Sequence, residues 1–137
     1  MKQELDTYLC TTYPKLFADR HKPMNETAMC WGFGCGDGWF QIINQLCQNI
    51  QHHLDWKNKE GEVVPQVVVQ QVKEKFGTLR FYYQGGDEYI AGLVSMAESI
   101  SGVTCETCGN PGTSTGGGWV KTACKEHGGI DYDSEEE

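Results

Sequence analysis

Four residues toward the C-terminal end of the chain have the types and spacing of metal ligands. Two residues separate Cys105 from Cys108, and after fifteen further residues the same spacing joins Cys124 to His127. Structural zinc sites use four sulfur and nitrogen donors in a tetrahedron, and two paired turns supply such a set. Because protein would fill all four positions, none is left for a reactive water molecule. The sequence therefore predicts a structural Zn²⁺ ion.

Glycine follows each pair of predicted ligands, at Gly109 and Gly128. A zinc knuckle curls its backbone amides toward the thiolates, and glycine tolerates the positive φ that this curl requires. Between the pairs, residues 119–122 could form a short strand. The alternative of a redox dithiol would need a βαβ context, which this sequence lacks. We therefore expect residues 102–130 to form a zinc-binding unit whose folding depends on the metal.

The other cysteines and histidines allow two further hypotheses. One is a second metal site, although the spacing is irregular; its candidates are Cys10, Cys30, Cys35, Cys47, His21, His52 and His53. The other is a cysteine-dependent enzyme, in which Cys35 precedes a helix start and acts as nucleophile with a histidine as base. Free buried cysteines are commoner than either, and nothing in the sequence orients a base.

Alternating glycines occupy residues 31–39, Trp-Gly-Phe-Gly-Cys-Gly-Asp-Gly-Trp. Exposed amides at a helix N-terminus can bind a phosphate or carboxylate, so this loop is a candidate anion site. We favour a close crossing of two backbone segments, with Asp37 capping the amides itself and repelling other anions.

A basic patch is predicted on a β-hairpin formed by residues 63–75 and 78–83. Alternation of apolar and polar positions places one set of residues on the solvent face: Lys73, Lys75, Arg80 and Tyr82. Three cations and a tyrosine would attract an anionic ligand. The alternative is a solvated sheet face with glutamate partners nearby.

These residues need a scaffold, and the hydrophobic spacing supplies one. Apolar residues recur at helical spacing in residues 38–55 and 87–100, and a short helix is expected at 3–10. The predicted fold class is α+β: an antiparallel β-hairpin or small sheet packed by two main helices, with a C-terminal zinc-knuckle unit. We expect residues 1–101 to form the body, 102–130 the zinc unit packed on it, and 131–137 an acidic tail.

Composition and charge limit the function classes. The chain has 137 residues, a mass of 15.3 kDa and a net charge of −8. The tail holds five of the nineteen acidic residues, which leaves eleven cations against fourteen anions in residues 1–130. Sequence-independent nucleic-acid binding needs a cationic surface, and −3 is too little charge for mimicry of DNA. No secretory signal or membrane-spanning run is visible, so we expect a cytoplasmic protein with reduced cysteines and no membrane partner.

Three blocks of sequence together resemble an uncharacterised family of small bacteriophage accessory proteins. They are Gly-Asp-Gly-Trp at 36–39, Val-Lys-Glu-Lys-Phe-Gly-Thr-Leu-Arg-Phe-Tyr at 72–82, and the 105–127 segment with Pro-Gly at 111–112 and Gly-Gly-Trp at 117–119. The resemblance covers about residues 30–128. It implies an infected bacterial cytoplasm and an accessory role such as antagonism of host defence, and it provides no catalytic residues.

The expected function is therefore non-enzymatic binding by a zinc-stabilised protein. The partner would be a host protein or an anionic, nucleotide-like ligand bound by Lys73, Lys75, Arg80 and nearby aromatic side chains. The absence of an evident nucleophile–base pair favours binding over catalysis. The alternatives are a nucleic-acid-binding zinc protein and an enzyme that uses Cys35.

Overall fold

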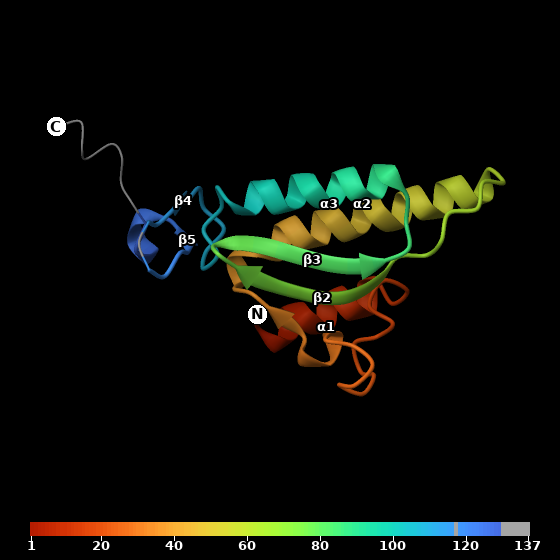
Figure 1. Ribbon diagram of the computed structural model, residues 1–137, viewed down its shortest axis with the longest axis horizontal. Helices are drawn as coiled ribbons and strands as arrows, with labels where there is room; N and C mark the ends of the chain where they lie inside the picture. The colour runs from red at the N-terminus through yellow and green to blue at the C-terminus, as the bar shows by residue number, and fades with distance from the viewer. Residues whose placement is uncertain (117, 130–137) are drawn as a thin grey trace.

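The computed structural model describes residues 1–116 and 118–129 (Figure 1). The described residues form three α-helices and five strands, in the order α1 (Gln3–Thr12), β1 (Phe33–Gly34), α2 (Phe40–Lys59), β2 (Val68–Lys75), β3 (Thr78–Gln84), α3 (Glu88–Ser101), β4 (Thr113–Ser114) and β5 (Thr122–Ala123). Single 3₁₀ turns lie at η1 (Met29–Trp31), η2 (Asp37–Trp39) and η3 (Lys125–His127). The predicted α+β class is confirmed, and the acidic tail at 131–137 lies outside the described residues.

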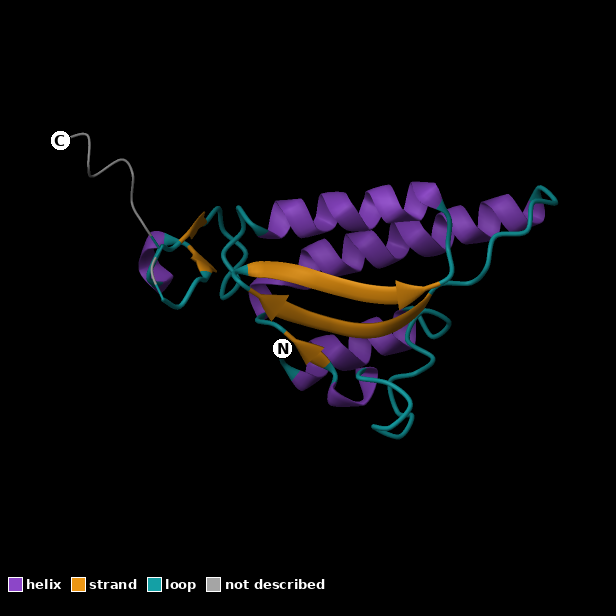
Figure 2. Cartoon of the chain, in the orientation of Figure 1, coloured by secondary structure: helices purple, strands orange, loops and turns teal. Residues whose placement is uncertain are grey.

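The main sheet has three strands in the order β1-β2-β3 (Figure 2). The predicted hairpin is confirmed: β2 and β3 pair antiparallel, with Val72 opposite Phe81 and a β-bulge between Val69 and Gln71. The first strand begins at Val68 rather than at residue 63. The parallel strand β1 was not predicted, because two residues are too short to show an alternating pattern.

Both main helices occur where the sequence predicts them, and α2 continues four residues beyond the predicted end at residue 55. Asp87 caps α3, since its Oδ1 accepts a hydrogen bond from the Ile90 N–H at 3.1 Å. The predicted cap of α2 is wrong. Asp37 lies in η2, and its Oδ1 accepts from the backbone N–H of Lys2 at 2.7 Å instead of from a helix amide.

A hydrophobic core lies between the sheet and the helices. Trp39 from η2, Ile43 from α2, Leu79 from β3 and Ile90 from α3 are fully buried, and Leu9 brings α1 into the same core. Such apolar burial contributes about 1.5–3 kcal/mol for each large side chain. The helices α2 and α3 run side by side over one face of the hairpin (Figure 1).

The irregular stretch between α1 and β1 is tied to α1 by a buried ion pair. Arg20 Nη2 lies 2.9 Å from Asp6 Oδ2, and Arg20 Nη1 donates to the Cys30 carbonyl at 3.0 Å. A buried charge of either sign is tolerated only with such partners. This pair fixes a segment that has no regular secondary structure of its own.

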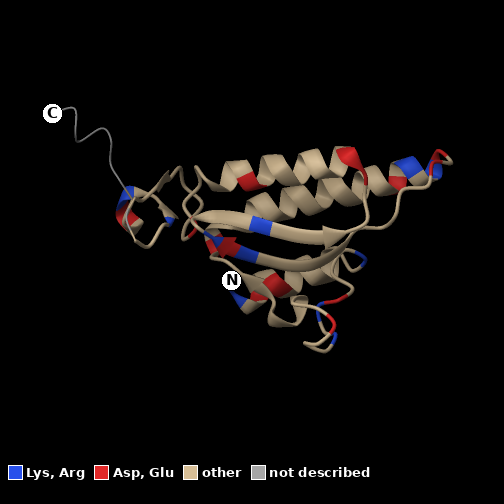
Figure 3. Ribbon diagram, in the orientation of Figure 1, with Lys and Arg blue, Asp and Glu red and all other residues tan. Residues whose placement is uncertain are grey.

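The opposite face of the hairpin carries polar side chains. Figure 3 shows Lys or Arg on both β2 and β3, next to acidic residues near the hairpin turn.

Along the described part of the chain, no helix has the length and apolar character needed to cross a membrane.

Candidate metal centre

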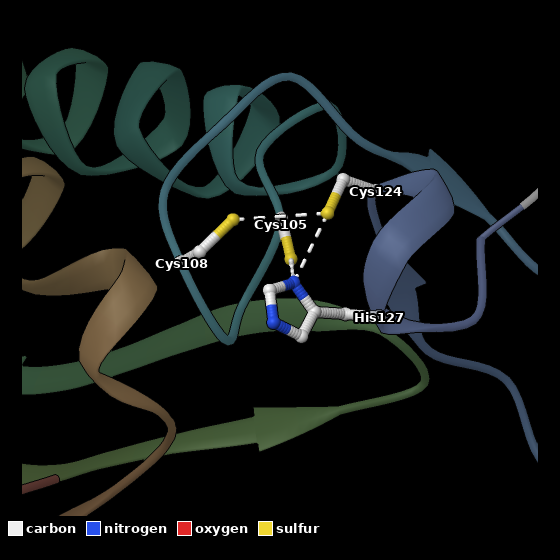
Figure 4. Close-up of side chains that lie close together, drawn as sticks. All are labelled: Cys105, Cys108, Cys124 and His127. Atoms are coloured by element: carbon white, nitrogen blue, oxygen red, sulfur yellow. Dashed lines mark hydrogen bonds between the residues drawn. The ribbon is translucent and has the colours of Figure 1, made fainter.

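The four predicted ligands converge at the C-terminal end of the described chain (Figure 4). Their donor atoms all lie within 4.8 Å of one another. The separation of Cys108 Sγ and Cys124 Sγ is 3.7 Å, and His127 Nδ1 lies 3.6 Å from Cys105 Sγ and 3.1 Å from Cys124 Sγ.

These separations suit a tetrahedral zinc ion. Bonds of about 2.3 Å to sulfur and about 2.0–2.1 Å to nitrogen place two sulfurs about 3.8 Å apart, and a sulfur and a nitrogen about 3.5 Å apart. The Cys108–Cys124 and Cys105–His127 separations match these values closely. A cluster of three thiols and one imidazole could therefore hold a metal ion such as zinc.

Two tight turns place the ligands, and each depends on a glycine. Gly109 has φ +85° and donates its N–H to the Cys105 carbonyl at 2.9 Å. Gly128 has φ +96°, and Gly129 donates to the Cys124 carbonyl at 2.7 Å. The predicted need for positive φ after each ligand pair is confirmed.

A small hairpin carries the second ligand pair to the first. Thr113 of β4 pairs with Ala123 of β5, and Cys124 follows β5 directly. The observed strand starts at Thr122, so the strand predicted at 119–122 overlaps it by one residue.

Backbone amides favour the thiolate form of Cys105. Burial alone would raise the pKa of this thiol, but N–H groups of Cys124, Cys108 and Thr107 donate to the sulfur and lower its pKa to about 6. The thiolate is the form of cysteine that binds metal. Cys108 shows the opposite shift: a backbone hydrogen bond from Asn110 lowers its pKa, but burial and the neighbouring Cys105 and Cys124 thiols outweigh this and raise it, so the local environment favours the thiolate at Cys105 and not at Cys108.

The glycine-rich loop before α2 packs directly against the C-terminal metal unit, which is the described part of residues 102–129. Gly38 donates its N–H to the Glu106 carbonyl at 2.8 Å, and Gly36 donates to Glu106 Oε2 at 2.8 Å. A Cβ on either glycine would overlap a backbone carbonyl oxygen of residue 105 or 106. The favoured interpretation, a close backbone crossing, agrees with this geometry, but the carboxylate that occupies the loop belongs to Glu106 and not to Asp37.

Cys35 is poorly suited to act as a nucleophile. Its side chain is buried, and burial together with the nearby Glu106 charge raises the pKa of the thiol to about 12. A nucleophilic cysteine needs the opposite shift. Within residues 1–116 and 118–129, no second group of three or more possible ligands converges, so the described structure does not support the hypothetical second metal site.

The predicted basic patch occupies the face of the hairpin opposite the core. Lys73 lies directly across from Arg80, while Lys75 pairs with Thr78 and Tyr82 with Gln71. Lys73 and Arg80 are half-buried, and the other two predicted residues are exposed. The main chain thus places the predicted residues together on one face.

Ion pairing of the patch by glutamate is not seen. Among the described residues, no carboxylate lies within 4.0 Å of the Lys73, Lys75 or Arg80 charges, and Lys75 Nζ lies 5.5 Å from the Phe76 ring centroid. The nearby Glu74 carboxylate accepts a hydrogen bond from the Gly77 N–H at 2.7 Å. The Arg80 Nε is buried and has no hydrogen-bond partner within the part of the chain that the structure describes.

One polar cluster was not predicted. His53 of α2 is buried, and its Nε2 lies 2.7 Å from Asp87 Oδ2 at the start of α3. In the sequence, His53 follows Ile50 by three residues, which places the imidazole on the core-facing side of the helix. This spacing does not identify a hydrogen-bond partner for the imidazole.

Comparison with known proteins gives no match among family models, curated proteins or solved structures. The bacteriophage setting implied by the three sequence blocks therefore remains a proposal.

Proposed function

We propose that this protein is a zinc-stabilised binding protein whose basic hairpin face recognises an anionic surface on a partner protein. The observation that carries the proposal is the cross-strand pair of Lys73 and Arg80, neither of which has an ion-pair partner among the described residues. A buried donor left without a partner, such as Arg80 Nε, costs about 1–3 kcal/mol. That atom is out of reach of a partner protein, so a carboxylate or phosphate on the partner would pair with Lys73 and with the remainder of the half-buried Arg80 guanidinium.

The metal would act as a structural element. With four protein ligands, zinc has no open coordination position for chemistry. The metal unit also contacts the hairpin turn, since Thr122 Oγ1 donates to the Gly77 carbonyl at 2.6 Å. Zinc would thereby support the end of the hairpin on which Lys75 lies.

The biological setting follows only from the sequence resemblance. We place the protein in the cytoplasm of an infected bacterium, as a phage accessory protein that antagonises host defence by binding a host protein. The resemblance in the three sequence blocks supports this setting, and the open basic face supports the binding role.

Charge reversal on the hairpin tests the binding role. Tagged wild-type protein and the double variant Lys73→Glu/Arg80→Glu are used to capture partners from infected cells. The variant should lose the partner while its circular dichroism spectrum and melting temperature remain those of a folded protein. Lys15→Glu/Lys59→Glu is the matched control, because it changes the net charge equally at exposed sites outside the predicted basic patch.

Two results would contradict the proposal. Retention of the partner by the folded Lys73→Glu/Arg80→Glu variant would remove the basic face from the mechanism. Loss of the captured partner after nuclease treatment, together with a steep salt dependence, would favour the nucleic-acid alternative instead.

A further inference from the structure

A cavity of about 390 Å³ lies between the C-terminal half of α2 and the start of α3. Its lining is rich in rings and basic groups: Asn49, His52, His53, Trp56, Lys57 and Tyr89. It lies at the end of the molecule opposite the metal unit, where α3 begins (Figure 1). Its volume is in the range of sites that bind small molecules.

The inner wall of this cavity is held in place by a network of contacts. His53 Nε2 is fixed by Asp87, and the imidazole stacks on the Tyr89 ring with centroids 4.3 Å apart and an interplanar angle of 22°. Asp87 is itself fixed, because its other oxygen accepts the Ile90 N–H. The orientation of both rings is therefore set before any ligand arrives, which lowers the entropy cost of binding.

Large aromatic surfaces face the cavity but remain in contact with water. Trp56 is 51% exposed and Tyr89 is 56% exposed, so a bound ligand could cover much apolar area on either ring. Flat ligands gain by stacking on such rings, because aromatic pairs contribute beyond their buried area. Trp56 comes from α2 and Tyr89 from α3, so a planar ligand in the cavity could contact rings from both helices.

The charge of the lining favours an anion. Every ionisable group that lines the cavity is a lysine, a histidine or a tyrosine, so the lining contains no carboxylate. Lys57 Nζ lies 5.0 Å from the Trp56 ring centroid, next to the aromatic surface. Its ion pair with Glu62 is loose, at 3.6 Å, and the Glu62 side chain is 63% exposed. A phosphate could therefore reach Lys57 without having to displace a buried partner.

From these contacts we propose that the cavity is a binding site for a planar aromatic anion of the size of a nucleoside monophosphate. The base stacks against Trp56 and Tyr89, and the phosphate is bound by Lys57. This site is separate from the basic hairpin face, which offers an extended surface to a macromolecule. The two sites can therefore be tested independently.

Isothermal titration calorimetry with simple probes tests the site. The titrants are the adenosine, guanosine, cytidine and uridine monophosphates, with adenosine, ribose 5-phosphate and inorganic phosphate as partial ligands. We expect saturable binding of at least one nucleoside monophosphate with Kd below about 1 mM, at least fivefold weaker binding of the matching nucleoside, and none of the ring-free anions. Failure of all four monophosphates to bind, or equal affinity for inorganic phosphate, would overturn the proposal.

Variants locate the binding. Trp56→Ala and Tyr89→Ala should each weaken binding at least tenfold, whereas Tyr89→Phe, which keeps the ring, should bind like the wild type. Lys57→Gln should weaken the monophosphate about fivefold and leave the nucleoside unchanged. Trp31→Ala is the matched control, because Trp31 is 73% exposed and lies outside the cavity lining. Wild-type affinity in folded Trp56→Ala and Tyr89→Ala would overturn the assignment, whatever happens to the hairpin variants.

Discussion

The helical and sheet body and the C-terminal metal unit are stabilised in different ways. The body buries large apolar side chains such as Trp39, Ile50 and Leu79 between helices and sheet. In the described part of residues 102–129, the buried apolar side chains are Cys105 and Ala123 alone, and each strand has two residues. Apolar burial alone is too small to hold such a segment, and we propose that a metal ion bound by the four converging residues stabilises it.

The two regions meet through hydrogen bonds that each use at least one backbone group. The amides of Gly36 and Gly38 reach Glu106, and the Trp39 indole donates to the Thr104 carbonyl at 2.9 Å. Close backbone approach of this kind leaves no room for a Cβ. The junction therefore depends on glycine on one side and on a correctly folded knuckle on the other.

Removal of a metal ligand should have the largest effect. Cys108→Ser should abolish metal binding and unfold residues 105–127, while α2 and α3 keep their structure. Zinc binding in such units contributes on the order of 10–16 kcal/mol. Elemental analysis would measure the metal, and amide hydrogen exchange would locate the loss of structure. Cys30→Ser is the control, because this thiol lies outside the cluster. Unchanged metal content and melting temperature in Cys108→Ser would contradict the structural role.

A core substitution should destabilise the body without removing the metal. Trp39→Ala should lower the free energy of unfolding of the body by about 3–5 kcal/mol while the metal stays bound. Trp39→Phe keeps most of the volume but leaves the Thr104 carbonyl without its donor, which should cost about 1–3 kcal/mol. Urea denaturation followed by circular dichroism measures both. Loss of metal from folded Trp39→Phe would show that the two regions are not separable.

A pair of glycine substitutions isolates the junction. Gly38→Ala should destabilise the protein by about 1–3 kcal/mol, because the new methyl group overlaps the Cys105 carbonyl oxygen. Gly92→Ala is the matched control: it lies inside α3 with open space around it, so it should stabilise by about 0.5–1 kcal/mol. Thermal melts of both variants with and without a chelator compare them. Equal effects of the two substitutions would refute a tight junction.

The smallest effect is expected at the end far from the metal. The hydrogen bond from His53 lowers the pKa of Asp87 below its ordinary value, so this carboxylate stabilises the fold above about pH 4 and loses the effect as pH falls through its native pKa. Asp87→Asn retains a capping side chain and should cost less than about 1 kcal/mol at pH 7. In thermal melts the difference from wild type should shrink as pH falls below about 4 and should be lost below the native pKa of Asp87. A difference that persists there would assign the effect to capping rather than to charge.

Local spacing carried the correct predictions. The ligand pairs Cys105–Cys108 and Cys124–His127, with their glycines, form turns of four residues, so their geometry is set by near neighbours. The main helices follow from apolar residues three and four positions apart, and the hairpin follows from alternation around Gly77. In each case the sequence neighbours are also the spatial neighbours.

Tertiary structure decided which polar side chains outside the metal cluster pair with residues far away in the sequence. Asp37 was expected to cap α2, but its carboxylate accepts a hydrogen bond from the Lys2 backbone N–H. The Glu106 carboxylate binds the Gly36 N–H, which lies 70 positions away in the sequence. The His53–Asp87 pair likewise joins residues 34 positions apart. A carboxylate or imidazole has many possible partners of similar chemistry, and nothing in its own neighbourhood selects one. Only the packing of helices on the sheet brings one partner close and excludes the rest. The sequence by itself therefore determined the main helices, the hairpin and the four candidate metal ligands. The tertiary structure determined the cavity between α2 and α3 and the junction between the two regions.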